Sequence, residues 1–252
     1  MDLSYIFPGV DYSVDSILLF QDDGQWWDVL FYFYPQINRD KFDSLPTSQQ
    51  KTYLRDILQK HYNDNAKSEI DNKVVKYNAH WKLHKNQIED AFYDAFQCDI
   101  KDIFNDVVGN ITFNPICPRF LSTRTFDVFY KNSERGALGV SLHELIHFVW
   151  FDVWQKHFDD CADEYETPHL KWVFSEMVVD PIMRHDRRLK DINPYFDDGC
   201  AYECFYLMSV NNIPILDTLY KMYVGSKNVV EFMEQGYAYC NKYEHEIRTQ
   251  MQ

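Results

Sequence analysis

Apolar residues recur every three or four positions along much of the chain, which is the spacing of one face of an α-helix. Residues 48–58 carry this pattern over about three turns. A longer pattern covers about 67–96 and consists of Ile70, Val74, Val75, Tyr77, Trp81, Ile88, Phe92 and Phe96. It predicts one long helix laid across a sheet.

The pattern changes near residue 110. Residues 111–118 are rich in β-forming side chains but include Pro115 and Pro118. Because proline cannot donate to a strand ladder, this segment is predicted to lie at a sheet edge, where either an extended peptide could add as a further strand or the prolines merely block aggregation. Residues 123–130 alternate well enough for a second strand.

Further helices are expected at about 133–154 and 169–180, with Pro181 as a kink or a stop. The rest of the chain is helical in pattern, with breaks at prolines and glycines. The sequence therefore predicts a helix-rich α+β fold with a small mixed sheet. We expect one continuous domain over 1–252, with a mostly helical part at 1–109, a core at 110–186 and a helical part at 187–252.

Charge and composition exclude several function classes. The chain has 25 Lys and Arg against 39 Asp and Glu, a net charge of −14, so it repels phosphate backbones and nucleic acid is not expected as a partner. No apolar stretch approaches the ~20 residues of a membrane span. The first residues lack the basic start of a secretory signal, and six sparse cysteines favour reduced thiols. These features predict a cytoplasmic protein without a membrane partner.

The candidate chemistry lies in the helix expected at 133–154. It contains His143-Glu144-Leu145-Ile146-His147, the H-E-x-x-H pattern of zinc hydrolases. Two histidines four residues apart lie on one helix face, so both imidazoles can reach one ion. Glu144 leans over the same ion and can take a proton from a zinc-activated water.

A third protein ligand is needed, and several downstream positions compete for this role. The extended motif with Gly and then His fails, because those positions hold Trp150 and Val153. His157, or Asp159 or Asp160, is near in sequence, but His157 points about 80° away from His147 around the helix.

The other candidate lies on the next helix, where Glu176 and Asp180 are four residues apart. Glu176 would complete a His-His-Glu site. Asp180, one turn later, could accept the free ring N–H of a ligand histidine and fix its tautomer.

H-E-x-x-H on one helix followed by E-x-x-x-D on the next resembles the gluzincins, the thermolysin-like branch of zinc metallopeptidases. The resemblance covers about 111–180 and implies a zincin-like fold with the sheet backing the active-site helix. It implies one Zn²⁺ held by His143, His147 and Glu176, with Glu144 as general base and Asp180 holding His143. The gap of 29 residues from His147 to Glu176 is longer than in thermolysin.

The resemblance implies a zinc metallopeptidase acting on a peptide or protein substrate. Two alternatives stay open: a regulatory protease with a single target, and a catalytically inactive zinc-binding interaction module on the same fold. Peptidases of this type also need a group that stabilises the oxyanion. The sequence does not choose among the candidates for it, which are Tyr165, His185, Tyr195, Tyr202, Tyr206 and His245.

Overall fold

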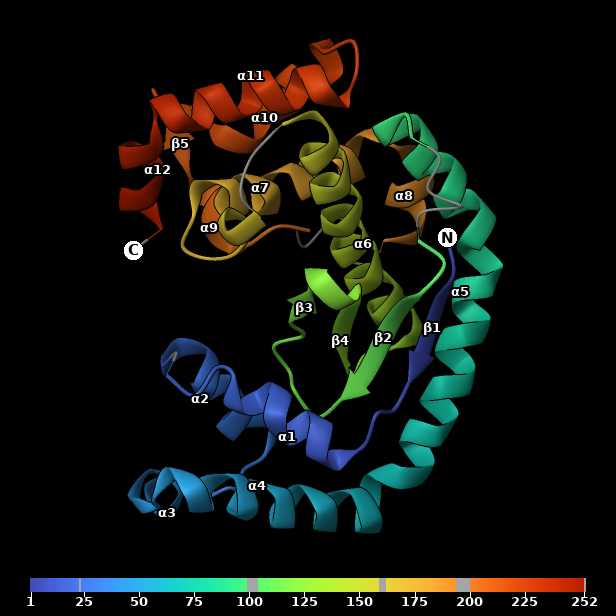
Figure 1. The fold of residues 1–252 in the computed structure, drawn as a ribbon, viewed down its shortest axis with the longest axis vertical. Helices are drawn as coiled ribbons and strands as arrows, with labels where there is room; N and C mark the ends of the chain where they lie inside the picture. The colour runs from blue at the N-terminus through green and yellow to red at the C-terminus, as the bar shows by residue number, and fades with distance from the viewer. Residues whose placement is uncertain (23, 99–103, 159–161, 194–199, 252) are drawn as a thin grey trace. The chain divides into compact units, whose positions relative to one another are not determined.

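The computed structural model describes residues 1–22, 24–98, 104–158, 162–193 and 200–251. The strands are β1 (Leu3–Ile6), β2 (Val107–Thr112), β3 (Arg119–Phe120), β4 (Thr125–Phe129), β5 (Ser209–Val210) and β6 (Ile213–Pro214). The helices are α1 (Val10–Leu18), α2 (Gly24–Phe33), α3 (Arg39–Ser44), α4 (Thr47–His61), α5 (Lys67–Phe96), α6 (Glu134–His157), α7 (Leu170–His185), α8 (Arg187–Ile192), α9 (Glu203–Leu207), α10 (Ile215–Gly225), α11 (Val229–Lys242) and α12 (Glu244–Gln250). This is a helix-rich α+β fold, as predicted (Figure 1).

The chain forms two compact units. The sheet unit consists of Asp2–Leu83 and Asn105–Ser141, and the helical unit consists of Met1, His84–Phe104 and Leu142–Gln252. Helices α5 and α6 each contribute residues to both units. The expectation of one continuous domain stays a prediction.

The sheet unit contains a four-stranded mixed sheet in the order β1-β2-β4-β3 (Figure 1). Strands β1, β2 and β4 are parallel, and β3 runs antiparallel to β4. The strand expected at 123–130 is confirmed as β4, but the edge position expected for 111–118 is wrong. Strand β2 pairs with β1 through residues 107–110 and with β4 through residues 108–112, so it lies inside the sheet. It ends at Thr112, and both prolines follow it without interrupting its ladder.

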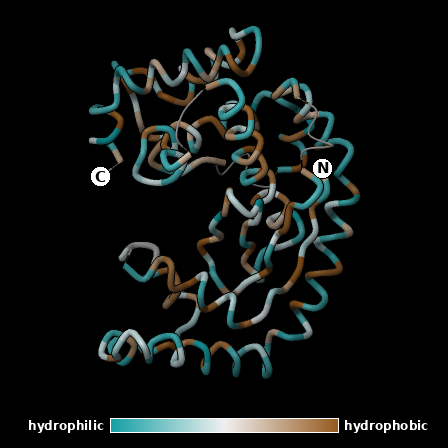
Figure 2. Tube along the Cα trace, viewed as in Figure 1, coloured by the Kyte–Doolittle hydropathy of each residue, from teal (hydrophilic) through white to brown (hydrophobic). Residues whose placement is uncertain are grey.

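The helical periodicities are confirmed closely. Helix α5 has the bounds of the pattern at 67–96, and its hydrophilic and hydrophobic positions alternate along its length (Figure 2). Helix α7 continues through Pro181 to His185, so the helix does not stop at this proline. None of the described helices combines the length and apolarity that crossing a bilayer requires.

The first turns of α6 belong to the sheet unit. The Tyr5 hydroxyl on β1 and the Ser141 hydroxyl on α6 are 2.6 Å apart and fully buried. This contact fixes the first turns of α6 to the small sheet.

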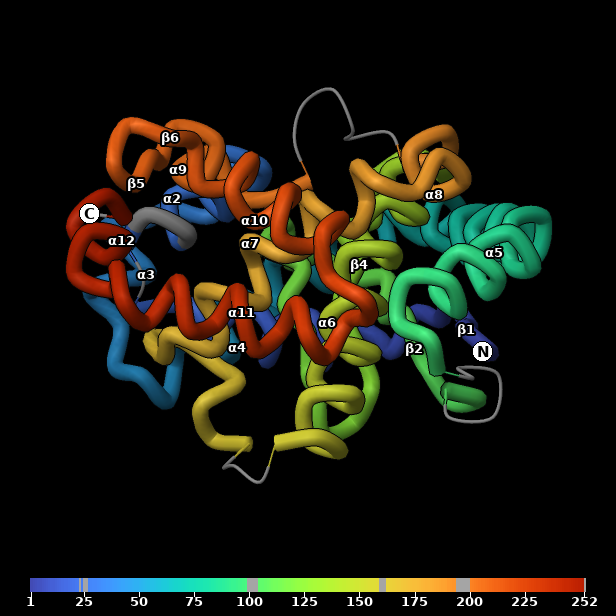
Figure 3. The backbone as a smooth tube through the Cα atoms, turned by 90° about the horizontal axis from the view of Figure 1, so that it is seen from above, coloured from blue at the N-terminus to red at the C-terminus, as the bar shows by residue number. Residues whose placement is uncertain are grey.

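The helical unit is built around α7, of which thirteen residues are buried. Helices α10 and α11 pack against α7 (Figure 3). The rings of Trp150 on α6 and Phe174 on α7 meet edge to face at 5.3 Å, which fixes the two helices against each other. A Cβ at Gly236 on α11 would lie 2.5 Å from the Phe174 ring, so glycine permits this close approach.

The sheet unit buries one carboxylate, Asp127 on β4, in a polar network. It accepts hydrogen bonds from the hydroxyls of Tyr12 and Ser16 on α1. Burial raises the pKa of Asp127 to about 6, although the hydrogen bonds from these hydroxyls, Asn110 and Thr112 oppose the shift. Between pH 3.8 and about 6, the folded protein therefore keeps a proton on Asp127 that the unfolded chain has lost.

This buried acid predicts a pH-dependent stability. Above pH 6 the folded state contains the buried charge, whereas below the ordinary pKa of 3.8 both states are neutral at this residue. Lowering the pH from 7.5 to 4 should therefore stabilise the wild type by ~2 kcal/mol relative to Asp127→Asn, since each pKa unit is worth about 1.4 kcal/mol and the unfolded carboxyl is still mostly ionised at pH 4. Urea unfolding of both proteins across this range measures the difference, and a difference that does not change with pH would contradict the assignment.

Candidate metal centre

Helix α6 brings the histidine motif to one face. His143, Glu144 and His147 each offer one ligand atom, and these atoms lie within 4.8 Å of one another. The His147 side chain is fully buried and that of His143 is 23% exposed. The two histidines are therefore reachable from solvent on the side of His143.

Glu176 on α7 faces both imidazoles from the opposite helix. Its Oε2 atom lies 3.2 Å from Nε2 of His143 and 3.3 Å from Nε2 of His147. The two Nε2 atoms are 3.0 Å apart. Three ligand-type atoms from consecutive long helices thus form a nearly equilateral triangle, and the three residues predicted as metal ligands come together.

The size of this triangle can be compared with a metal site. Zinc bonds to nitrogen and oxygen of about 2.0–2.1 Å imply edges of about 3.3–3.4 Å between tetrahedral ligands. The observed edges of 3.0 to 3.3 Å are close to that value. Two imidazoles and one carboxylate are also a common donor set for divalent zinc. The residues present fit a divalent metal ion.

A backbone carbonyl orients His143. Its Nδ1 atom lies 2.9 Å from the Cys200 carbonyl oxygen. A carbonyl can only accept, so Nδ1 donates its proton and Nε2 is the atom that faces Glu176; in the neutral ring Nε2 carries the lone pair that an ion would bind. Burial lowers the pKa of His143, but the Glu176 hydrogen bond and the charges of Glu144 and Glu176 raise it more, so it lies above its usual 6.5.

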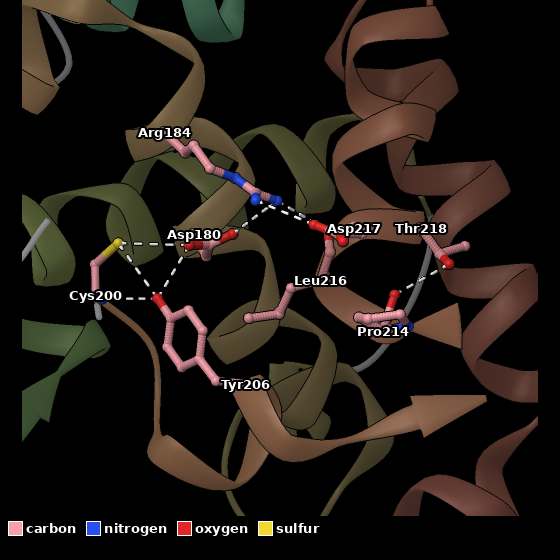
Figure 4. Close-up of polar contacts among 8 residues, drawn as sticks. All are labelled: Asp180, Arg184, Cys200, Tyr206, Pro214, Leu216, Asp217 and Thr218. Atoms are coloured by element: carbon pink, nitrogen blue, oxygen red, sulfur yellow. Dashed lines mark hydrogen bonds and ion pairs between the residues drawn. The ribbon is translucent and has the colours of Figure 1, made fainter. Parts of the chain in front are cut away.

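The expected role of Asp180 requires a correction. It was predicted to accept the ring N–H of His143, but that nitrogen faces the Cys200 carbonyl. Asp180 instead accepts a hydrogen bond of 3.0 Å from the Tyr206 hydroxyl and forms an ion pair of 3.2 Å with Arg184 (Figure 4). The ligand histidine takes its second partner from the main chain, which no side-chain motif could indicate.

Of the competing ligand positions, the structure describes His157. His157 is exposed at the end of α6, and Asp159 and Asp160 lie outside the described residues. Among the oxyanion candidates, Tyr195 also lies outside the described residues. The Tyr206 hydroxyl donates to Asp180 and accepts the Cys200 N–H, so its hydrogen bonds are made within the protein.

Comparisons with protein-family models, with curated proteins and with solved structures return no match. The geometry of the site is therefore what supports a function.

Proposed function

We propose that this protein is a zinc-dependent metallopeptidase of the gluzincin type. The triangle formed by His143, His147 and Glu176 is the observation that carries this proposal. Three protein ligands are typical of catalytic zinc sites, whereas structural sites usually have four. The order of the motifs, H-E-x-x-H followed by a glutamate on the next long helix, favours the gluzincin branch.

His143, His147 and Glu176 would hold the ion; His147 and Glu176 are buried, whereas His143 is 23% exposed. A zinc ion in this site supplies Lewis acidity, which polarises a carbonyl group and acidifies water. The negative charge of Glu176 offsets part of the positive charge of the ion inside the protein.

Glu144 is the general base of the proposed reaction. It follows His143 directly on α6, is 8% exposed, and lies in the same group of ligand atoms without being needed for the triangle. Its carboxylate would take a proton from the attacking water and deliver it to the leaving amine. Because the group is largely shielded from solvent, its charge acts strongly on this proton transfer.

A peptide or protein is the substrate class that the gluzincin resemblance implies for this chemistry. The net charge of −14 disfavours nucleic acid as an alternative. No disulfide joins the cysteines within the described part of the chain, which supports a cytoplasmic location as part of the proposal.

Metal removal tests the proposal directly. Purified protein is expected to contain one zinc ion per chain and to cleave members of a random peptide library. A chelator should abolish cleavage, added zinc should restore it, and the far-UV circular dichroism should stay unchanged, since the helices pack through apolar cores away from the ion. Metal analysis, peptide profiling by mass spectrometry and circular dichroism provide the three readouts.

The same measurements separate the alternatives. A nearly blank peptide profile from a zinc-loaded protein would favour a protease with a single target. Loss of folded structure together with the metal would favour a structural site and an interaction module. A protein that takes up no divalent ion would contradict the proposed function.

A further inference from the structure

The main chain of Cys200 is held at both of its polar groups. Its carbonyl oxygen lies 2.9 Å from Nδ1 of His143, and its N–H donates a 2.9 Å hydrogen bond to the Tyr206 hydroxyl oxygen. Cys200 belongs to no helix or strand, so no backbone ladder fixes this carbonyl. Its position depends on the side chains that hold it.

Tyr206 is itself anchored. Its hydroxyl donates to Oδ1 of Asp180 at 3.0 Å while it accepts the Cys200 N–H (Figure 4). A carboxylate can only accept, so the two hydrogen bonds of the hydroxyl have fixed and complementary directions. Deleting this single oxygen removes both hydrogen bonds, and with them the path from Asp180 to the Cys200 N–H.

The anchor extends to α10 through Arg184. This side chain pairs with Asp180 at 3.2 Å and with Asp217 at 3.1 Å, and it donates to the Leu216 carbonyl at 3.3 Å. Asp180 is 5% exposed. Opposite charges attract more strongly at a position shielded from water, so the ion pair with Arg184 holds Asp180 in place for Tyr206.

The Cys200 thiol contributes shape rather than reactivity. It lies 3.9 Å from the Tyr206 oxygen and 4.0 Å from Asp180. Burial raises the pKa of this thiol to about 11, so it stays protonated at neutral pH. The ordered main chain at Cys200, and not its sulfur, is therefore the functional group that faces His143.

We infer that Tyr206 is a positioning residue for the metal centre. Tyr206 is held by Asp180 and fixes the main chain of Cys200 through its N–H. The Cys200 carbonyl then accepts the Nδ1 proton of His143, which leaves Nε2 to bind the ion. This inference rests on the proposed function. It assigns to Asp180 an indirect action on His143, through the Tyr206 hydroxyl and the main chain of Cys200.

Tyr206→Phe tests the inference, because it removes the hydroxyl and keeps the ring. Losing an orienting partner of a ligand histidine typically weakens metal binding 10–100-fold, so the zinc affinity of the variant should fall by about this factor. Competition with a chelating indicator measures it. Tyr220→Phe is the matched control: its ring lies 4.4 Å from the Arg184 guanidinium, a contact that phenylalanine keeps, and its zinc affinity should match the wild type.

A second readout does not depend on the metal. Nitrogen-15 NMR of the metal-free protein, at a pH high enough to keep the His143 ring neutral, should show the Nδ1–H tautomer in the wild type and in Tyr220→Phe. In Tyr206→Phe the signal should shift towards a mixture of tautomers. A merely structural role for Tyr206 would lower stability without changing the tautomer.

The outcomes distinguish this inference from the proposed function. Wild-type zinc binding together with unchanged affinity and tautomer in Tyr206→Phe would overturn the inference alone. Failure of the wild type to bind zinc would overturn the proposed function, and the tautomer would still decide the positioning role. If Tyr206→Phe does not fold, an Nε2–H tautomer of His143 in the wild type would overturn the inference and an Nδ1–H tautomer would support it.

Discussion

Glu144→Gln is expected to lower peptide hydrolysis by roughly 10²–10⁴-fold while the zinc content stays at the wild-type level. Glutamine keeps the size and position of the side chain but cannot take a proton. The three proposed ligand atoms, on His143, His147 and Glu176, are untouched by the change. Steady-state cleavage of a peptide found in the library screen gives the rate, and metal analysis of the same sample gives the zinc content.

The control for this prediction is Glu134→Gln, the same change at the first residue of α6. Glu134 pairs with Lys76 at the protein surface and should keep its cleavage rate close to that of the wild type. Undiminished hydrolysis by Glu144→Gln would remove Glu144 from the mechanism. Loss of zinc from that variant would instead make Glu144 a ligand.

His147→Ala is expected to weaken zinc binding by well over 100-fold and to abolish hydrolysis. The imidazole is fully buried, and its Nε2 lies 3.0 Å from that of His143 and 3.3 Å from the Glu176 carboxylate. Removing a direct ligand should cost more than the 10–100-fold typical of an orienting partner. Zinc affinity is measured by chelator competition, with circular dichroism as the check on folding.

His157→Ala is the matched control, because it removes an exposed histidine from the same helix. Its zinc affinity and its cleavage rate should equal those of the wild type. This pair also tests the alternative ligand considered from the sequence. Zinc retained by His147→Ala but lost from His157→Ala would place the metal at the other end of the motif helix.

Helical periodicity was the most reliable signal in this chain. The bounds of α5 follow from the apolar positions between 67 and 96, because a helix forms from contacts within a few residues. Pro181 shows where a local rule fails. Helix α7 passes through it, because almost every residue from 170 to 183 is buried and tertiary packing compensates for one missing N–H.

The strand at 107–112 illustrates a different failure. Its two following prolines suggested an edge, yet β2 pairs with β1 from the N-terminus and with β4. Which strand lies inside a sheet depends on partners about 100 residues away, and no local pattern reports them. The parallel pairing of β1 with β2 therefore escaped the analysis of the sequence.

Within the candidate site, the chain by itself determined the parts that depend on local geometry. The four-residue spacing of His143 and His147 sets both rings on one face of any helix. The pair Glu176 and Asp180, also four residues apart, marked Glu176 as a candidate on the next helix. Only the tertiary structure decided that Glu176 meets both rings and that His143 turns its second nitrogen to the Cys200 carbonyl. Every residue carries such a carbonyl, so the sequence contains no signal for the one that a fold brings to a histidine, and packing alone selects it.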